Sequence, residues 1–206
     1  MSAVPISRIP KSERRQLLDD LNYLNTSEIK TFCKRHSIPY TISIETKEGR
    51  RCKTQEDDRK GVMLERVRHF LKTGAVLQET CFSAAVVCFE ALPEEIGAGD
   101  RLHYGQYKKG SRNVTGLLKD LTGGHYRDGA IARILLREFW SRGQAPTFKK
   151  VANAWLEASR EHTQPNPEWA FLSDRARKTS GRGWKRMRAQ KAARVRKTLE
   201  RICGTR

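Results

Sequence analysis

Positive charge is distributed very unevenly along this chain of 206 residues. Residues 1–100 carry 16 Lys and Arg against 15 Asp and Glu, whereas residues 101–206 carry 25 against 8, so the second half holds +17 of the total +18. A folded domain with that much like charge is destabilised by self-repulsion unless a polyanion or salt neutralises it. The commonest polyanions are nucleic acids and anionic membranes, and the sequence therefore predicts a partner from one of these classes.

Composition narrows the class of protein further. Hydrophobic residues make up 37% of the chain, which is enough for one domain or two modest cores. The longest apolar stretch, residues 84–89, is far short of the roughly 20 residues that span a bilayer. The five cysteines form no CxxC pair and the N-terminus has no apolar signal region. We therefore expect an intracellular, cytoplasmic protein with no membrane partner, associated with the nucleoid if it is bacterial.

The first half has the apolar spacing of helices interrupted by a hairpin. Helices are predicted by three sets of residues: Leu17, Leu21 and Leu24; Ile29, Phe32 and Cys33; and Met63, Leu64, Val67, Phe70 and Leu71. Thr26 or Ser27 is expected to cap the second helix, and Gly74 to end the third. Residues 40–59 alternate around a turn at residues 47–49, which predicts a small hairpin inserted between the second and third helices.

The second half is predicted to be helical as well. An apolar helix is expected near residues 81–91, and residues 93–111 resemble a linker followed by a basic loop. Three short helices and a long terminal helix follow from these apolar sets: Val114, Leu117, Leu118 and Leu121; Ile131, Ile134, Leu135 and Phe139; Phe148, Val151, Trp155 and Ala158; and Trp184, Met187, Val195, Leu199 and Ile202. The predicted fold is therefore mainly α, with a module over residues 1–92 and a basic helical domain over residues 112–206.

Two segments of the first half resemble the helices of the SAP domain. The first helix of that family opens with Leu, three residues and Glu-Leu-Lys, and this pattern is matched after Leu24 by Glu28, Ile29 and Lys30. The second helix of the family has a Lys before Leu-hydrophobic-Glu-Arg-Leu, and this pattern is matched by Lys60, Met63, Leu64, Glu65, Arg66 and Val67. The likeness covers about residues 12–74. It implies a helix-loop-helix that binds duplex DNA, often A/T-rich, through its loop and the start of its second helix.

Two departures from the SAP pattern lie between these helices. Ser37 stands where the family usually has Gly, and residues 40–59 replace a loop of a few residues, an insertion that enlarges or moves the expected contact surface. Beyond the module, residues 111–114 (Ser-Arg-Asn-Val) and residues 147–155 are similar to the region that follows SAP-like segments in some bacterial proteins. That likeness brings no known activity with it.

The candidate DNA contacts are cations that can neutralise phosphates and release counterions. They lie in the SAP-like module, the inserted hairpin, the basic loop, the helix after Gly124 and the terminal helix: Lys30, Lys34, Arg50, Arg51, Lys53, Lys60, Lys108, Lys109, Arg112, Arg133, Arg137, Arg182, Lys185, Arg186, Arg188, Lys191 and Arg194. No acid occurs between Asp174 and Glu200, so the i,i+4 ion pairs of an ordinary solvated helix are missing there.

Several of these candidate segments also have a purely structural interpretation. The segment from Tyr104 to Asn113 fits a phosphate-binding loop before a helix, and it fits equally an ordinary basic loop with Ser111 as N-cap. The helix with Arg133 and Arg137 has the spacing of a helix-turn-helix, but three packed helices satisfy it too and are commoner. The tryptophans are interpreted as core anchors rather than as platforms for stacked bases.

Enzyme interpretations find little support in the sequence. It contains no Walker loop, GxSxG or HExxH, and its histidines are scattered. Cys33 and His36 lack a second pair of zinc ligands. The acids Glu56, Asp57 and Asp58 have the chemistry to hold Mg²⁺ for phosphodiester cleavage, but they are interpreted as solvated loop acids. We therefore expect no catalysis, metal or cofactor, and keep a metal-dependent nuclease as an alternative.

The hypothesis from sequence is a DNA-binding protein of mainly α fold. Its SAP-like module contributes one contact with double-stranded DNA, and the basic second half contributes most of the affinity. Two other classes fit the same charges. An RNA-binding or ribonucleoprotein component fits because lysine and arginine do not by themselves distinguish DNA from RNA, and a protein that docks its basic helix on an acidic protein or membrane surface fits as well.

Overall fold

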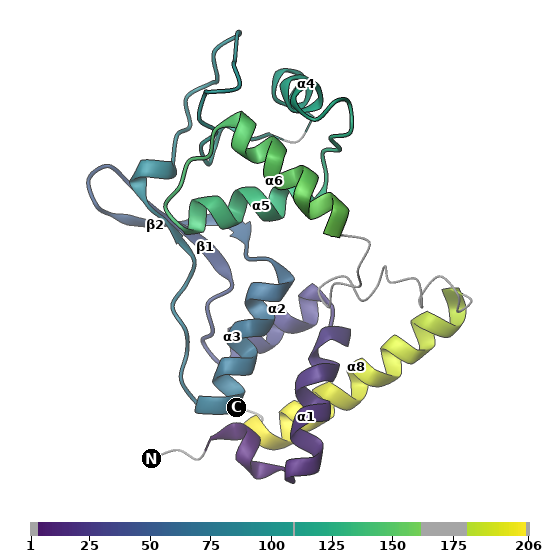
Figure 1. The fold of residues 1–206 in the computed structure, drawn as a ribbon. Helices are drawn as coiled ribbons and strands as arrows, with labels where there is room; N and C mark the ends of the chain where they lie inside the picture. Colours follow the sequence, from purple (N-terminus) through teal and green to yellow (C-terminus); the bar gives the residue numbers. More distant parts are fainter. Residues whose placement is uncertain (1–3, 109, 162–180, 205–206) are drawn as a thin grey trace. The chain divides into compact units, whose positions relative to one another are not determined.

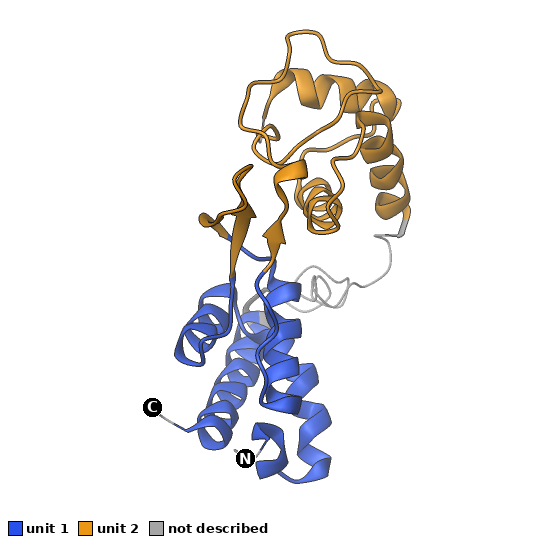
Figure 2. Ribbon diagram, turned by 90° about the vertical axis from the view of Figure 1, so that its left-hand side faces the viewer, with its two compact units in different colours: residues 1–40, 57–79, 165–206 blue, residues 41–56, 80–164 orange. Residues whose placement is uncertain are grey.

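The computed structural model describes residues 4–108, 110–161 and 181–204, and their fold is mainly α, as predicted (Figure 1). The chain forms two compact units, each built from segments that are distant in sequence (Figure 2). The first unit contains residues 1–40, 57–79 and 165–206, and the second contains residues 41–56 and 80–164. The structure thus divides the chain differently from the boundary expected between residues 92 and 112. Among the described residues, no helix combines the length and hydrophobicity needed to cross a bilayer.

The described part of the first unit contains four α-helices: α1 (Lys11–Asp20), α2 (Thr26–Arg35), α3 (Lys60–Thr73) and α8 (Gly181–Cys203). The shared core includes Ile29, Met63, Leu71 and Ile202, which were predicted apolar positions of their helices and are fully buried. Leu21 and Leu24, predicted for the first helix, are buried in the same core but lie beyond the end of α1, Leu21 in a 3₁₀ turn over Leu21–Tyr23. The helix α3 ends at Gly74, whose φ of 76° is the left-handed conformation expected at a helix end. Both ends of the chain therefore contribute to one core.

The cap of α2 differs from the prediction. Asn25, rather than Thr26 or Ser27, occupies the N-cap position. Its side chain accepts a hydrogen bond from the backbone N–H of Glu28, and the Glu28 carboxylate accepts one from the backbone N–H of Asn25, both at 2.7 Å. This reciprocal capping box satisfies two N–H groups that the first turn of a helix leaves without partners.

The second unit contains a three-stranded sheet with the order β2-β1-β3. The strands β1 (Thr41–Glu45) and β2 (Arg51–Asp57) confirm the predicted hairpin. The helix predicted near residues 81–91 is wrong: this segment forms β3 (Cys81–Phe82), parallel to β1, and a single 3₁₀ turn over Ala84–Val86. A short apolar run has the same composition in a buried strand and in a buried helix turn, so local periodicity could not separate them.

Three α-helices complete the second unit within its described residues: α4 (Arg112–Leu121), α5 (Ala130–Ser141) and α6 (Phe148–Glu161). All three were predicted. Trp140 and Trp155 are 4% and 6% exposed and belong to the core, as expected for anchors. The indole N–H of Trp140 donates to the backbone oxygen of Leu102 at 3.1 Å. Trp169 and the side chain of Trp184 lie outside the described residues.

Candidate nucleic-acid interface

The positive charge belongs to one folded unit rather than to one half of the sequence. The first unit has 25 Lys and Arg against 11 Asp and Glu, a net charge of +14. The second unit has 16 against 12, a net charge of +4. The unequal distribution along the chain therefore becomes a strongly basic unit, because α8 packs with the N-terminal helices.

One face of α8 is part of the core of the first unit. Ala192, Val195, Leu199 and Ile202 are between 0% and 3% exposed and recur at helical spacing. The helix packs on α1 and on the turns that flank it, beside which it is drawn in Figure 1. The predicted apolar stripe is thus confirmed at its C-terminal end, where it holds the helix to the protein.

The flanks of α8 carry cations that pair with acids from the N-terminal helices. Three of the distances are 3.0 Å from Arg188 to Glu28, 3.4 Å from Lys191 to Asp20 and 3.0 Å from Arg201 to Glu13. The i,i+4 partners missing from the α8 sequence are therefore replaced by partners from other helices. Arg188 and Lys191, both predicted to contact DNA, hold helices together in this structure.

Tyr23 contacts the ammonium group of Lys191 through both its hydroxyl and its ring. The ammonium group donates to the Tyr23 hydroxyl at 3.2 Å and lies 4.2 Å from the centre of its ring. The hydrogen bond to Tyr23, followed by the charge of Asp20, raises the pKa of Lys191 above its ordinary value. Lys191 therefore stays charged while it bridges α8 to the turn after α1.

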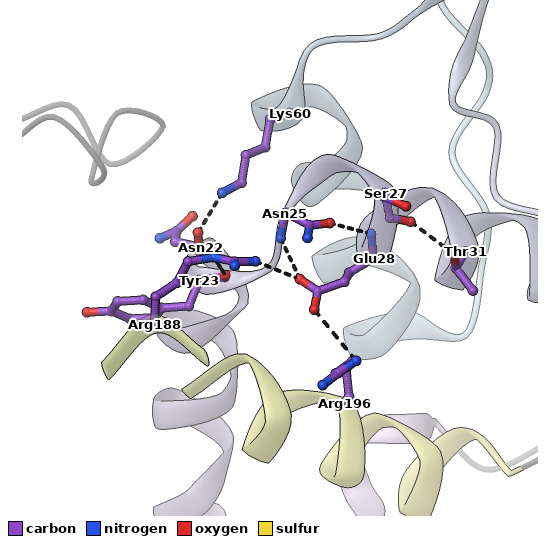
Figure 3. A network of polar contacts seen from close by, with 9 residues as sticks. All are labelled: Asn22, Tyr23, Asn25, Ser27, Glu28, Thr31, Lys60, Arg188 and Arg196. Carbon is purple, nitrogen blue, oxygen red and sulfur yellow. Dashed lines mark hydrogen bonds and ion pairs between the residues drawn. The ribbon is translucent and has the colours of Figure 1, made fainter. Parts of the chain in front are cut away.

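Glu28 is the centre of a polar network that joins α2 to α8 (Figure 3). Besides capping α2, its carboxylate accepts a bond from the Arg188 guanidinium and lies 3.7 Å from that of Arg196. Arg188 also donates to the backbone oxygen of Tyr23 at 3.1 Å. Glu28 is the acid of the SAP-like pattern, and its role in this structure is to fix α2 and α8 to each other.

Replacing Glu28 with alanine is expected to destabilise the first unit by about 1–2 kcal/mol, because the capping box and two partly buried ion pairs are lost together. Hydrogen exchange of the α2 and α8 amides measures the change. Glu65→Ala removes the same charge from an exposed position of α3 and should leave exchange nearly unchanged. Equal effects of the two substitutions would show that net charge, rather than the network, is responsible.

The outer face of α8 carries cations with a different environment. Arg186, Arg194 and Lys197 lie opposite the packed stripe and are exposed, and none has a carboxylate within 4 Å among the described residues. Lys185 is exposed as well, but it lies seven residues before Ala192 and so on the side of the helix that carries the packed stripe. Arg186 and Lys197 are eleven residues apart, which places them on one side of the helix about 16 Å apart along its axis. Lys197 was not among the predicted contacts, although its helical spacing from Arg186 was a signal in the sequence.

The cations of the SAP-like helices are mostly engaged within the unit. Lys30 lies 2.6 Å from the Asp57 carboxylate, and this hydrogen bond raises the pKa of Lys30. The ammonium of Lys60 donates to the backbone oxygen of Asn22 at 2.6 Å. Lys34 is exposed. Lys30, Lys34 and Lys60 were predicted to contact DNA, and of these Lys34 is the exposed one.

Ser37, at the end of α2, has a φ of 54°, the only positive value among the described non-glycine residues. Left-handed backbone costs an L-residue roughly 1–2 kcal/mol and costs glycine almost nothing. This is the position where the SAP family usually has Gly. Ser37 therefore holds a backbone conformation that glycine would adopt at lower cost.

The other predicted contacts belong to the second unit or are not described. The following are exposed there: Arg50, Arg51, Lys53, Lys108, Arg112 and Arg133. Arg137 pairs with Glu56 at 2.6 Å. Lys109 and the side chain of Arg182 lie outside the described residues. The structure therefore places the hairpin cations and the SAP-like helices in different units.

The loop before α4 is held by an acid. The Tyr107 hydroxyl donates to Asp128 at 2.5 Å, and the backbone N–H of Gly110 donates to the same carboxylate at 2.9 Å. Burial, followed by this hydrogen bond, raises the pKa of Tyr107. Ser111 occupies the N-cap position of α4 but its side chain makes no capping hydrogen bond. The carboxylate of Asp128 makes this loop a poorer phosphate site than its sequence indicates.

The three consecutive acids at the end of the hairpin face three different cations. Glu56 pairs with Arg137 and Asp57 with Lys30. Asp58 is only 6% exposed and lies 2.6 Å from Arg66, so its prediction as a solvated acid was wrong. The described residues contain no group of three or more His, Cys, Asp or Glu that could hold a metal ion.

Comparisons of the chain with protein-family models, curated proteins and solved structures give no match. Function therefore has to be inferred from the chain's own residues.

Proposed function

We propose that the first unit binds the phosphate backbone of double-stranded DNA through the outer face of α8, with the SAP-like helices α2 and α3 as a second contact. The net charge of +14 on this unit is the observation that carries the proposal. Its cations on the flanks of α8 are paired with acids, whereas those on the outer face are exposed. Exposed cations are the ones that can exchange solvent counterions for phosphates.

The dimensions of α8 suit a duplex. Its 23 residues extend about 34 Å, close to the length of one turn of B-form DNA. A helix of this kind contacts phosphates with little dependence on base sequence. Preference for A/T-rich duplex, which the SAP resemblance implies, would come from α2 and α3.

Removing α8 altogether is an unsuitable test, because a chain ending near residue 174 also loses Val195, Leu199 and Ile202 from the core. Substitutions on the outer face avoid this problem. We expect the combined variant R186A, R194A and K197A to weaken binding to an A/T-rich duplex at low salt. The slope of log affinity against log salt should become shallower by about 2–3, since each lost phosphate contact contributes about 0.9. Fluorescence anisotropy at several salt concentrations measures both quantities.

The matched control removes three exposed cations from the second unit, in the variant K119A, R142A and K149A. It has the same change of net charge and should retain most of the affinity and of the salt slope. Equal losses in both variants would contradict a binding face on α8. Tighter binding of a structured RNA than of the duplex would instead assign the protein to the RNA-binding class, because A-form RNA presents phosphates and 2′-hydroxyls in a different geometry.

A further inference from the structure

The second unit contains a pocket of about 550 Å³ at the junction between α5 and α6. Its charged and titratable lining residues are Arg101, His103 and Lys150, and no Asp or Glu lines it. Ala145 and Pro146 add an apolar wall. This volume falls in the range of about 300–1,000 Å³ that is typical of small-molecule sites.

Arg101 and Lys150 lie on two segments of the chain that are joined by backbone hydrogen bonds. The backbone N–H of Leu102 donates to Pro146 at 2.8 Å, and that of Phe148 donates to Asp100 at 3.0 Å. Arg101 and Thr147 form an antiparallel bridge between these bonds. Arg101 and the first turn of α6 are therefore fixed relative to each other by backbone pairing.

Both cations keep donors for a ligand. One Arg101 nitrogen donates to the backbone oxygen of Ala145 at 3.1 Å, and the remaining N–H groups have no partner among the described residues. The Lys150 ammonium donates to the Gln144 side chain at 3.2 Å and lies 5.1 Å from the centre of the Phe139 ring. An ammonium has three N–H groups, so Lys150 retains further donors.

The electrostatic surroundings favour an anion. The pocket lies at the N-terminus of α6, where the helix dipole is positive. The first N–H groups of this helix are already used by backbone oxygens and by the Thr147 hydroxyl, so direct contacts would come from the Arg101 and Lys150 side chains. His103 shares a hydrogen bond between its Nδ1 and the Gln106 oxygen at 3.1 Å, which fixes its ring at the pocket.

We propose that this pocket binds a phosphate monoester carried by a group of nucleoside size. A guanidinium and an ammonium together complement the two charges of a monoester, and the apolar wall provides a surface for the attached group. A free nucleotide and the phosphorylated 5′ end of a polynucleotide share this chemistry. The site is independent of the basic face of α8, because every residue named for it belongs to the second unit.

Calorimetric titration of the full chain with adenosine 5′-monophosphate and with adenosine tests the proposal. The nucleotide should bind at least tenfold more tightly than the nucleoside, since the loss of a charged hydrogen-bond partner costs about this much affinity. R101A and K150A should each weaken nucleotide binding about tenfold or more. K149A removes a neighbouring exposed cation that does not line the pocket and should leave binding unchanged. Thermal unfolding of each variant checks that the second unit remains folded.

Two further experiments distinguish a free nucleotide from a polynucleotide 5′ end as the ligand, and the pocket proposal from the proposal for α8. A short single strand with a 5′-phosphate should compete better than the same strand with a 5′-hydroxyl if polynucleotide ends are the source, and equal competition assigns the site to free nucleotide. The α8 variant R186A, R194A and K197A should bind the nucleotide normally. Equal affinity for nucleotide and nucleoside, or unaltered nucleotide binding by both R101A and K150A, overturns the site and leaves the proposal for α8 unaffected.

Discussion

Replacing Asp58 with alanine is expected to lower the free energy of unfolding of the first unit by about 3–5 kcal/mol. The substitution leaves Arg66, which is 4% exposed, charged and without its carboxylate partner 2.6 Å away. Burying an uncompensated charge costs far more than an ordinary lost contact, because water cannot replace the missing partner.

The position of Arg66 explains why this pair matters for the fold. From α3, its guanidinium also donates to the backbone oxygens of Pro39 at 2.9 Å and Gln78 at 3.1 Å. Residues 40 and 79 are the last of the first unit before the chain continues into the second. The Arg66–Asp58 pair therefore ties both departing segments to α3, and its loss should loosen them together.

Hydrogen exchange of the α3 amides gives the free energy for the first unit separately from the second. Asp57→Asn is the neighbouring control and should change exchange much less, because the Lys30–Asp57 pair is partly solvated. The double variant D58L and R66M should recover much of the stability, since a buried ion pair can be replaced by well-packed apolar side chains. A D58A protein within about 1 kcal/mol of the wild type would contradict a large contribution of the Arg66–Asp58 ion pair to stability.

The helices could be predicted because their signals are local. Apolar spacing located α1, α2 and α3, and Gly74 ended α3 where the sequence indicated. Burial of Asp58 could not be predicted, because it depends on Arg66, whose orientation is set by packing. The short strand β3 was missed for a related reason: its hydrogen-bond partner, β1, lies nearly forty residues earlier in the chain.

The candidate interface was predicted in composition but not in arrangement. The cations of α8 were evident from the sequence, whereas their division into paired flanks and an exposed outer face depends on Glu13, Asp20 and Glu28, which are 160 or more residues away from their partners. Arg188 and Lys191 differ from Arg186 only in the side of the helix they occupy. Helical spacing gives that difference only after the packed face of α8 is known.

Replacing Gly105 with alanine is the second substitution with a large expected effect. Gly105 belongs to the loop at residues 104–113, and close packing requires a glycine at this position. Its φ is 99°, and an added Cβ would lie 2.5 Å from the backbone oxygen of Cys88 and 2.7 Å from the Phe89 ring. The neighbouring Tyr104 exchanges backbone hydrogen bonds with Val86 and Cys88, so the clash cannot be relieved without breaking this pairing.

We expect G105A to destabilise the second unit by about 2–5 kcal/mol, from backbone strain and overpacking together. Urea unfolding followed by tryptophan fluorescence measures the loss, because Trp140 and Trp155 belong to the core of this unit and the ring centre of Trp140 is 5.5 Å from that of Tyr104. G110A is the matched control: its φ is 78°, but no atom lies within 4 Å of the added Cβ, so only about 1 kcal/mol should be lost. If both variants lose the same amount, positive φ alone accounts for the effect. A larger loss in G105A shows that the close approach of residues 88 and 89 fixes the start of this loop.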